Sequence, residues 1–324
     1  MAIYIDNEQV RELLPMDECI QAMEDAFRHE AQGLGGSLVR QTLFYPGGRQ
    51  RLMIGSSPGF DTYGFKTYGG GVNLVLAFST SQHTLEAIVE SRVLSEIRTG
   101  AVAGLATKYM ANDDASTIGV IGSGLQAKAQ IEAICAVRPI TKVKVYTRTA
   151  ENREGFAEEL RNDLALDAVA VETGEECISG SDVIVTATGS RDPVFAAEWL
   201  SPGAHINAIG ATTPGRREID EHTVGRCDVV VVESVAQAKV ECGELMLAED
   251  RGQFQWSQAV EMRHLVTGLA GHRPSRDAIT LFNGLGVAME DTAAAGVVLR
   301  KAKDLGLGVQ LPIEVRGGAP RRIR

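Results

Sequence analysis

A glycine-containing turn between an apolar run and a helical pattern constrains the fold of this chain more than any other feature. The apolar run covers residues 118–121, and Gly122-x-Gly124-x-x-Ala127 follows it directly at the start of a helical pattern. Gly122 permits a tight turn, and Gly124 lets a ligand approach the backbone without meeting a Cβ atom. A strand, such a turn and a helix in succession are typical of a dinucleotide-binding βαβ unit, whose helix N-terminus faces a pyrophosphate.

The runs that follow this turn support the same interpretation. The glycine pattern alone also occurs in ordinary turns, so its context decides between the two readings. A second β-like run covers residues 142–146, after one helix length, and further runs cover 182–186, 205–209 and 228–233. Because strands that alternate with helices form parallel sheets, we predict an α/β protein that contains a Rossmann domain.

The composition argues against several classes of function. The 324 residues suffice for two domains, and the 44% hydrophobic content is ordinary for a globular protein. A net charge of −10 without any basic block disfavours binding to nucleic acid or to an anionic membrane. We therefore expect neither a nucleic-acid partner nor a membrane partner.

The cysteines and histidines give no sign of a metal site or of a disulfide framework. The five cysteines are scattered and form no C-x-x-C pair, and the six histidines have no ligand-like spacing. We therefore expect no bound metal, and we expect reduced thiols in a cytoplasmic protein. Charged residues near the N-terminus argue against a signal peptide, and no apolar run reaches the ~20 residues of a membrane span.

The region before the glycine turn has a different pattern. Helical spacing predicts one helix over residues 15–32 and another over 95–110, which leads into the strand before the turn. Several short extended pieces lie between them and predict a mixed or antiparallel sheet, separate from the nucleotide domain. These pieces cover residues 38–45, 51–55, 64–68, 72–78 and 86–90. Near the C-terminus we expect a helix over 287–305 and a disordered tail over 317–324.

The residues after the second Rossmann strand bear on the choice of cofactor. An NAD-selective fold usually ends this strand in a carboxylate, which binds the ribose 2′-hydroxyl. Here Tyr146 is followed by Thr147-Arg148-Thr149, and a guanidinium at that point pairs with a 2′-phosphate. We therefore predict a preference for NADP(H), with NAD(H) as the alternative. Arg148 could also be an ordinary solvated arginine at a strand end. However, the absence of a carboxylate and the presence of an arginine at this point both favour NADP(H).

Hydroxyl-rich turns follow two later strands and suggest the walls of a nicotinamide pocket. One contains Thr186-Ala187-Thr188, and the other contains Gly210-Ala211-Thr212. Both lie at carboxyl ends of parallel strands, where α/β sheets bind ligands, although either could be a mere turn. The residues that we expect to contact the cofactor are Thr99, Gly122, Ser123, Gly124, Leu125, Gln126, Thr147, Arg148, Thr149, Asn152, Thr186, Ala187, Thr188, Ile209, Gly210, Ala211 and Gly286.

Four cations in or next to the N-terminal sheet form a candidate substrate site: Arg40, Arg51, Lys66 and Arg98. Each alone is most simply read as a solvated charge. The sheet is otherwise apolar, however, and a buried cation needs a partner. Because no carboxylate run lies near them in sequence, we expect an anionic ligand, and arginine offers a carboxylate bidentate geometry.

Several motifs together resemble the ornithine cyclodeaminase/mu-crystallin family. They are Gly64-Phe65-Lys66, Arg98-Thr99-Gly100 with the small residues after it, Gly122-Ser123-Gly124-Leu125-Gln126-Ala127, His205-Ile206-Asn207-Ala208-Ile209-Gly210, and Thr280-Leu281-Phe282 with Gly286 and Glu290-Asp291 beyond it. The resemblance extends over residues 2–313. It implies a Rossmann domain (113–286) inserted into a substrate-binding and dimerisation domain (1–112 with 287–324), and a homodimer.

The resemblance also implies roles for individual residues. Arg40, Lys66 and Arg98 match positions that hold the substrate carboxylate, and Lys66 lies nearest the reacting carbon and nitrogen. The residues after Lys66, from Thr67 to Gly70, depart from the family's commoner Trp-Val-Asn pattern. Thr212 stands where cyclodeaminases have an aspartate, and a threonine hydroxyl cannot act as a general base near neutral pH.

The departure at Thr212 favours the ketimine reductase-like branch of the family, which also lacks this aspartate. Reduction of a preformed imine needs a bound carboxylate, a hydride donor and one proton. We therefore expect reduction of a small α-imino or cyclic ketimine carboxylate, such as Δ1-pyrroline-2-carboxylate or Δ1-piperideine-2-carboxylate, with Lys66 and Thr212 as the catalytic residues. The alternatives are an ornithine cyclodeaminase, an alanine dehydrogenase-like activity, or a non-catalytic protein that binds NADPH or a small ligand.

Overall fold

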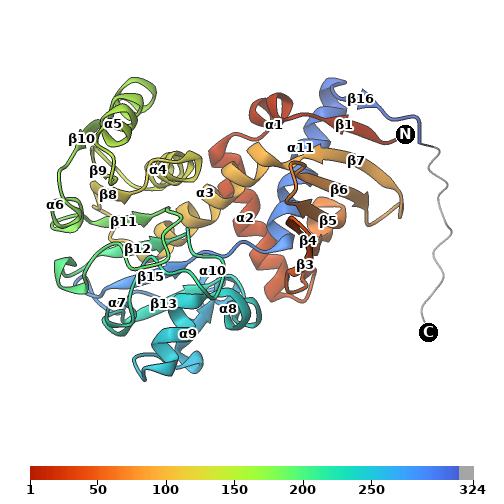
Figure 1. The fold of residues 1–324 in the computed structure, drawn as a ribbon. Helices are drawn as coiled ribbons and strands as arrows, with labels where there is room; N and C mark the ends of the chain where they lie inside the picture. Colours follow the sequence, from red (N-terminus) through yellow and green to blue (C-terminus); the bar gives the residue numbers. More distant parts are fainter. Residues whose placement is uncertain (314–324) are drawn as a thin grey trace. The chain divides into compact units, whose positions relative to one another are not determined.

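The computed structural model describes residues 1–313 (Figure 1). The tail expected to be disordered, residues 317–324, lies outside the described residues. Within residues 1–313, no helix is both long enough and apolar enough to cross a membrane.

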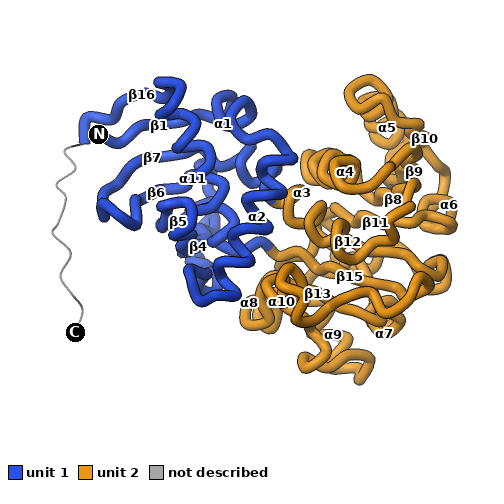
Figure 2. Tube along the Cα trace, turned by 180° about the vertical axis from the view of Figure 1, so that it is seen from behind, with its two compact units in different colours: residues 1–98, 286–324 blue, residues 99–285 orange. Residues whose placement is uncertain are grey.

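The chain divides into two compact units, which Figure 2 shows in different colours. The first contains residues 1–98 together with the chain from Gly286 onward, and the second is Thr99–Leu285. The N-terminal boundary therefore lies within a helix, α3 (Ser91–Met110), and not after residue 112 as expected. The physical reason is close packing inside the second unit, because a Cβ atom on Gly100 would lie only 2.4 Å from the carbonyl oxygen of Ala129.

The first unit is built on a mixed sheet, as the sequence predicts. Its strand order is β16-β1-β7-β6-β5-β4-β2, with β3 also paired to β4. The pair β1–β7 is parallel and the other pairs are antiparallel. The strands are β1 (Ile3–Ile5), β2 (Gly36–Ser37), β3 (Gln41–Tyr45), β4 (Gly48–Ser57), β5 (Thr62–Tyr68), β6 (Leu74–Ser79), β7 (Leu85–Glu90) and β16 (Val309–Gln310).

The first unit has two long helices, of which one packs on this sheet and the other packs against that helix. They are α2 (Met16–Ala31) and α11 (Ala288–Leu305), and α11 contacts β4, β5 and β6. The start of α11 lies very close to β4, because a Cβ atom on Gly55 would lie 2.6 Å from the backbone nitrogen of Met289. The shorter α1 (Asn7–Leu13) begins at Asp6, whose side chain accepts a hydrogen bond from the Gln9 backbone.

The second unit is the predicted Rossmann fold, with a fully parallel sheet. Its strand order is β10-β9-β8-β11-β12-β15-β13-β14. The strands are β8 (Thr117–Ile121), β9 (Lys142–Tyr146), β10 (Asp167–Ala170), β11 (Val183–Thr186), β12 (His205–Ala208), β13 (Val229–Val232), β14 (Ala259–Glu261) and β15 (Thr280–Asn283). The helices besides the second half of α3 are α4 (Leu125–Val137), α5 (Ala150–Leu164), α6 (Gly174–Ile178), α7 (Glu221–Gly225), α8 (Val235–Glu241), α9 (Gly243–Asp250) and α10 (Met262–Val266).

Two apolar clusters cover the two faces of this parallel sheet. Within β11, Val183 and Val185 belong to one cluster and Ile184 belongs to the other. Successive residues of a strand point to opposite faces, so a strand that is buried on both sides is apolar throughout. This explains why β13 and most of β11 are continuous apolar runs in the sequence.

Candidate active site

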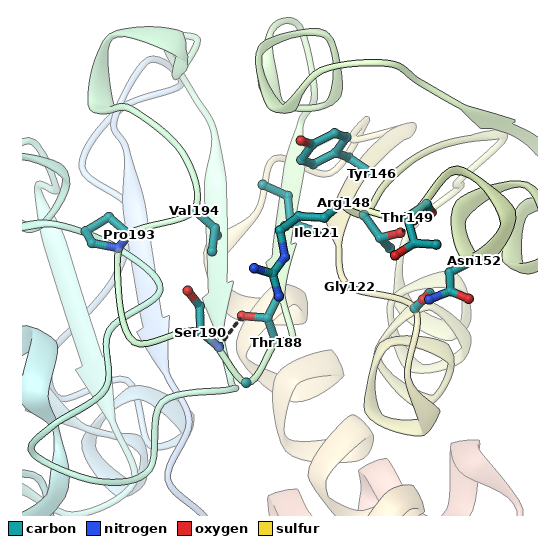
Figure 3. A pocket seen from close by; sticks show the side chains of 13 residues that line it. Ile121, Gly122, Tyr146, Arg148, Thr149, Asn152, Thr188, Ser190, Pro193 and Val194 are labelled. Atoms are coloured by element: carbon teal, nitrogen blue, oxygen red, sulfur yellow. Dashed lines mark hydrogen bonds between the residues drawn. The ribbon is translucent and has the colours of Figure 1, made fainter.

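A cavity of about 610 Å³ lies at the carboxyl ends of the Rossmann strands, entirely within the second unit. Figure 3 shows that its side chains come from the ends of β8 and β9, from the start of α5 and from the segment after β11. This is the edge at which parallel α/β sheets bind ligands. The expected cofactor residues that line it are Gly122, Ser123, Thr147, Arg148, Thr149, Asn152 and Thr188.

The backbone of the glycine turn suits a pyrophosphate. Gly122 has φ +118°, and a Cβ atom on it would lie 2.5 Å from the carbonyl oxygen of Ala187, so only glycine fits there. A Cβ atom on Gly124, the residue before α4, would meet no described atom within 4 Å. None of the described side chains caps that helix end, and uncapped N–H groups with the positive end of the helix dipole favour a phosphate.

Arg148 brings a positive charge to the far side of the same cavity. In Figure 3 its side chain extends into the cavity towards Thr188 and Ser190. None of the described residues that line the cavity is a carboxylate. The lining therefore fits a dinucleotide and does not repel a 2′-phosphate.

The other residues expected at the cofactor do not line this cavity. Thr99 lies in the second unit's part of α3, and Leu125 and Gln126 begin α4. Ile209 and Ala211, which follow β12, are buried. Thr212, which was expected as a catalytic residue, is half-buried. Gly286 belongs to the first unit, where a Cβ atom on it would lie 2.5 Å from Nη1 of Arg98.

A buried glutamate connects the two hydroxyl-rich turns. Glu218 accepts hydrogen bonds from the backbone N–H of Thr188 (2.5 Å), the backbone N–H of Gly210 (2.6 Å) and the hydroxyl of Thr186 (2.9 Å). Three donors on one carboxylate fix the ends of β11 and β12 relative to each other. Sequence reasoning missed this residue, because a glutamate after two arginines in a polar turn carries no signal.

A second buried glutamate supports the first. Glu244 accepts hydrogen bonds from the backbone N–H of Glu218 (2.7 Å) and from the side chain of Asn283 at the end of β15. Burial raises the pKa of Glu244 to about 8, and the nearby Glu218 carboxylate adds to the rise. We call Glu218 and Glu244 the glutamate pair.

In the first unit, the expected substrate cations come together beside α11. Arg40, Lys66 and Arg98 are buried, with 5–6% of each residue exposed. Nζ of Lys66 lies 3.0 Å from Oδ1 of Asp291, and Nε of Arg98 lies 3.0 Å from the same oxygen. Arg98 also pairs with Glu290 at 2.5 Å. We call these five residues the cation cluster.

Further contacts tie this cluster to the sheet. Arg40 donates a hydrogen bond of 2.7 Å to the carbonyl oxygen of Gly286. The ring of Tyr68 lies 5.2 Å from Nζ of Lys66, 5.9 Å from the guanidinium carbon of Arg40 and 5.6 Å from that of Arg51. Such distances are typical of cation–π contacts. Arg51, also expected at the substrate, is half-buried and reaches the Tyr68 hydroxyl at 3.4 Å.

The argument that these cations lack a carboxylate partner in the protein is wrong. Glu290 and Asp291 supply the partners, although they lie 192 and 193 residues from Arg98 along the chain. The cause is the return of α11 to the first unit, because sequence proximity says nothing about a helix that packs on strands β4 and β5. The two acids lie in the first turn of α11, where the helix dipole favours negative charge.

The cluster changes the acidity of its members. Burial lowers the pKa of Lys66 to about 8; the ion pair with Asp291 opposes this shift, and repulsion from Arg98 and Arg40 adds to it. Burial alone would raise the pKa of Asp291, but Arg98 and Lys66 outweigh it and hold the pKa below its usual value. Near neutral pH the cluster therefore holds an ionised carboxylate beside an ammonium that can give up its proton.

Comparisons with known proteins agree with both units. The model of the ornithine cyclodeaminase/mu-crystallin family matches residues 3–306. A Δ1-pyrroline-2-carboxylate reductase of Bacillus cereus is 37% identical over 242 residues, which are 74% of each chain. The similarity therefore extends well beyond the glycine turn.

Solved structures extend the likeness to the whole fold. A Δ1-pyrroline-2-carboxylate reductase of Thermococcus litoralis, in complex with NADH and L-proline, has a TM-score of 0.91 and 29% identity, covering 95% of this chain and 100% of that one. An archaeal alanine dehydrogenase dimer with bound NAD has a TM-score of 0.90 and 31% identity, covering 97% and 99%. This chain is an oxidoreductase that belongs to the ornithine cyclodeaminase/mu-crystallin family.

Proposed function

We propose that this protein is an NADP(H)-dependent imine reductase. Its substrate is a small α-imino or cyclic ketimine carboxylate of the Δ1-pyrroline-2-carboxylate or Δ1-piperideine-2-carboxylate type, and its product is the amino acid. The observation that carries the proposal is the buried cation cluster, in which Arg40, Lys66 and Arg98 lie beside one another in a family of enzymes that act at carbon–nitrogen bonds.

The first unit would bind the substrate. Arg40 and Arg98 clamp its carboxylate, since guanidinium groups match the two oxygens of a carboxylate. The two carboxylates on Arg98 fix the direction of its guanidinium. Lys66 donates the proton to the imine nitrogen, which suits a pKa of about 8. Holding the substrate in one orientation supplies much of the acceleration.

The second unit would bind the cofactor. Gly122, Ser123 and the start of α4 hold the pyrophosphate, and Arg148 with Thr149 and Asn152 holds the 2′-phosphate. The related structures contain NADH or NAD, which supports a nicotinamide dinucleotide in this chain. When it is bound, the reduced nicotinamide supplies a hydride to the imine carbon. The preference for the phosphorylated form rests on Arg148.

A homodimer is part of the proposal, and one face of the first unit's sheet supports it. The face opposite Lys66 carries apolar side chains, including Tyr63 and Phe78, whose rings stack at 5.3 Å, and Ile54, which is 40% exposed. An exposed apolar patch on a sheet marks an association site. Light scattering should give a dimer for the wild type and a monomer for Ile54→Asp; a monomeric wild type would contradict this part.

The activity is tested by following the absorbance of reduced cofactor with a panel of substrates. The panel contains both cyclic imines, pyruvate with ammonia, and ornithine with oxidised cofactor. We expect the highest kcat/KM for a cyclic imine, with NADPH preferred over NADH. Ammonia and proline from ornithine without added reductant would instead indicate a cyclodeaminase, which the threonine at position 212 argues against.

A second candidate is an alanine dehydrogenase. The 31% identity and TM-score of 0.90 to the archaeal alanine dehydrogenase favour it. A higher kcat/KM for pyruvate with ammonia than for either cyclic imine would select this activity. Cofactor binding without oxidation across the whole panel would indicate a non-catalytic protein.

A further inference from the structure

One oxygen of Asp291 is buried without a donor. Asp291 is 1% exposed, and its Oδ1 receives both Lys66 and Arg98 at 3.0 Å. Its Oδ2 has no hydrogen-bond partner among the described residues. An ionised carboxylate oxygen that is shut away from water costs free energy unless a donor reaches it. The missing donor is therefore a group that the substrate could bring.

The surroundings of this oxygen restrict what that donor can be. The charged and titratable groups that face Lys66 and Asp291 come from several elements: Arg40 before β3, Arg51 on β4, Tyr68 on β5, Arg98 on α3 and Glu290 on α11. Glu290 is engaged by Nη1 of Arg98. Asp291 is thus an acid of the cluster with an open acceptor, and its other oxygen, Oδ1, contacts the amine that is proposed to serve the substrate nitrogen.

We propose that Asp291 is a catalytic residue whose Oδ2 accepts a hydrogen bond from the protonated nitrogen of the substrate. This inference rests on the proposed imine reductase activity. It gives the cluster the anionic partner for a cationic nitrogen that the threonine at position 212 cannot supply.

The step balances with groups already named. A proton passes from Nζ of Lys66 to the imine nitrogen, so that an N–H bond forms as the Nζ–H bond breaks. The iminium N–H points to Oδ2 of Asp291. When bound, the reduced nicotinamide would supply a hydride to the imine carbon, and the electron pair of the C=N bond would move to nitrogen. The product is the neutral amine, and Lys66 regains its proton from solvent.

Two ligands that differ in their nitrogen test the contact between Oδ2 of Asp291 and the substrate nitrogen. L-proline carries both a carboxylate and a cationic N–H group, whereas cyclopentanecarboxylate has the same ring size and carboxylate but no nitrogen. For Asp291→Asn we expect proline affinity to fall roughly 10–100-fold, as for loss of a hydrogen bond to a charged group. Affinity for cyclopentanecarboxylate should stay within about twofold, because that ligand makes no such bond. Calorimetry on one preparation gives both affinities, so a partly folded sample does not change their ratio.

The matched controls use the same helix and the same side chain. Asp304→Asn changes an exposed carboxylate of α11 and should leave both affinities unchanged. Asp291→Glu restores the charge and should recover part of the proline affinity, which a purely structural role would not predict. If Asp291→Asn weakens both ligands equally, or neither, Asp291 does not contact the substrate nitrogen.

The pH profile of imine reduction gives an independent readout. Lys66 must be protonated, so kcat falls as pH rises through its pKa, and loss of the Asp291 charge should move this fall to lower pH. If the pH dependence of kcat were the same in Asp291→Asn as in the wild type, Asp291 and Lys66 would not be coupled during the reaction. Failure of the proposed function itself looks different, because the wild type would then reduce no imine and bind neither ligand.

Discussion

Each unit contains a carboxylate that is almost completely buried, but the pKa values of the two carboxylates are shifted in opposite directions. Asp291 in the first unit and Glu244 in the second are both 1% exposed. The pKa of Asp291 lies below its usual value, whereas burial and Glu218 raise that of Glu244 to about 8. Burial alone raises both, so the sign of the neighbouring charge decides the outcome. Asp291 faces Lys66 and Arg98, and Glu244 faces another acid.

This difference separates a region suited to chemistry from a region suited to support. In the cation cluster, ionised groups of both signs lie together and the pKa of Lys66 is near 8. In the glutamate pair, the carboxylate of Glu218 accepts hydrogen bonds from the end of β11 and from the turns after β11 and β12. Charge changes in the cluster should therefore alter turnover, and those in the glutamate pair should alter stability and cofactor binding.

The largest effect is expected for Lys66→Ala. Loss of a proton donor should lower kcat roughly 10³-fold, within the range for general acid catalysis. The cofactor cavity lies in the other unit, so the dissociation constant for NADPH should stay nearly constant, as measured by fluorescence titration. Equal losses in turnover and in NADPH affinity would contradict the division of roles.

A smaller effect is expected for Glu218→Gln, and on a different quantity. The amide places a donor where the carboxylate accepts from the Gly210 N–H, which should reduce the free energy of unfolding by about 3 kcal/mol. KM for the cofactor should rise, because the turns after β11 and β12 lose their common anchor. Urea unfolding and steady-state kinetics measure both, and the alkaline fall of kcat should not move.

The third prediction concerns the pH dependence of stability. The pKa of Glu244 is higher in the folded state than in the unfolded state. Its protonated form therefore contributes to the free energy of unfolding at low pH, and this contribution is lost as pH rises towards about 8. Between pH 5 and 8 we expect the wild type to lose on the order of 2 kcal/mol through this pair, and Glu244→Gln to lose less. A variant as pH-sensitive as the wild type would show that Glu244 is ionised in the fold. Asp291, with a lowered pKa, should lose its contribution only in acid, below its usual pKa.

The fold was largely predictable because its signals are local. The strand before Gly122, the turn and the helix after it lie within about 20 residues, and the second strand matches β9 (Lys142–Tyr146) at both ends. Small residues hid the boundary between the units, because Gly100 and Gly104 read as ordinary helix but pack against α4. The spacing of apolar residues predicts a helix or a strand, but it does not predict which other element packs against it.

The candidate site was predictable only in part, for the same physical reason. Arg40, Lys66 and Arg98 stood out as cations near apolar strands, and the structure brings them together. Their partners Glu290 and Asp291 belong to a helix nearly 200 residues beyond Arg98. Glu218 had no signal of any kind, since its role depends on three donors at the ends of two separate strands, β11 and β12. Pairings across long sequence distances come from the tertiary fold alone.

The smallest effect is expected at the cofactor cavity, where Arg148 brings one charge to an otherwise uncharged lining. Arg148→Ala should lower the preference for NADPH over NADH about tenfold, since a charge-assisted hydrogen bond to phosphate is worth about 1.5 kcal/mol or more. NADH, which lacks the 2′-phosphate, should be used almost as well as by the wild type. The exposed Arg251 provides a control, because Arg251→Ala removes a charge from the same unit away from the cavity lining. An unchanged ratio in Arg148→Ala would mean that the cavity discriminates through the hydroxyls of Thr147 and Thr149 or not at all, and the cofactor preference would then lose its main support.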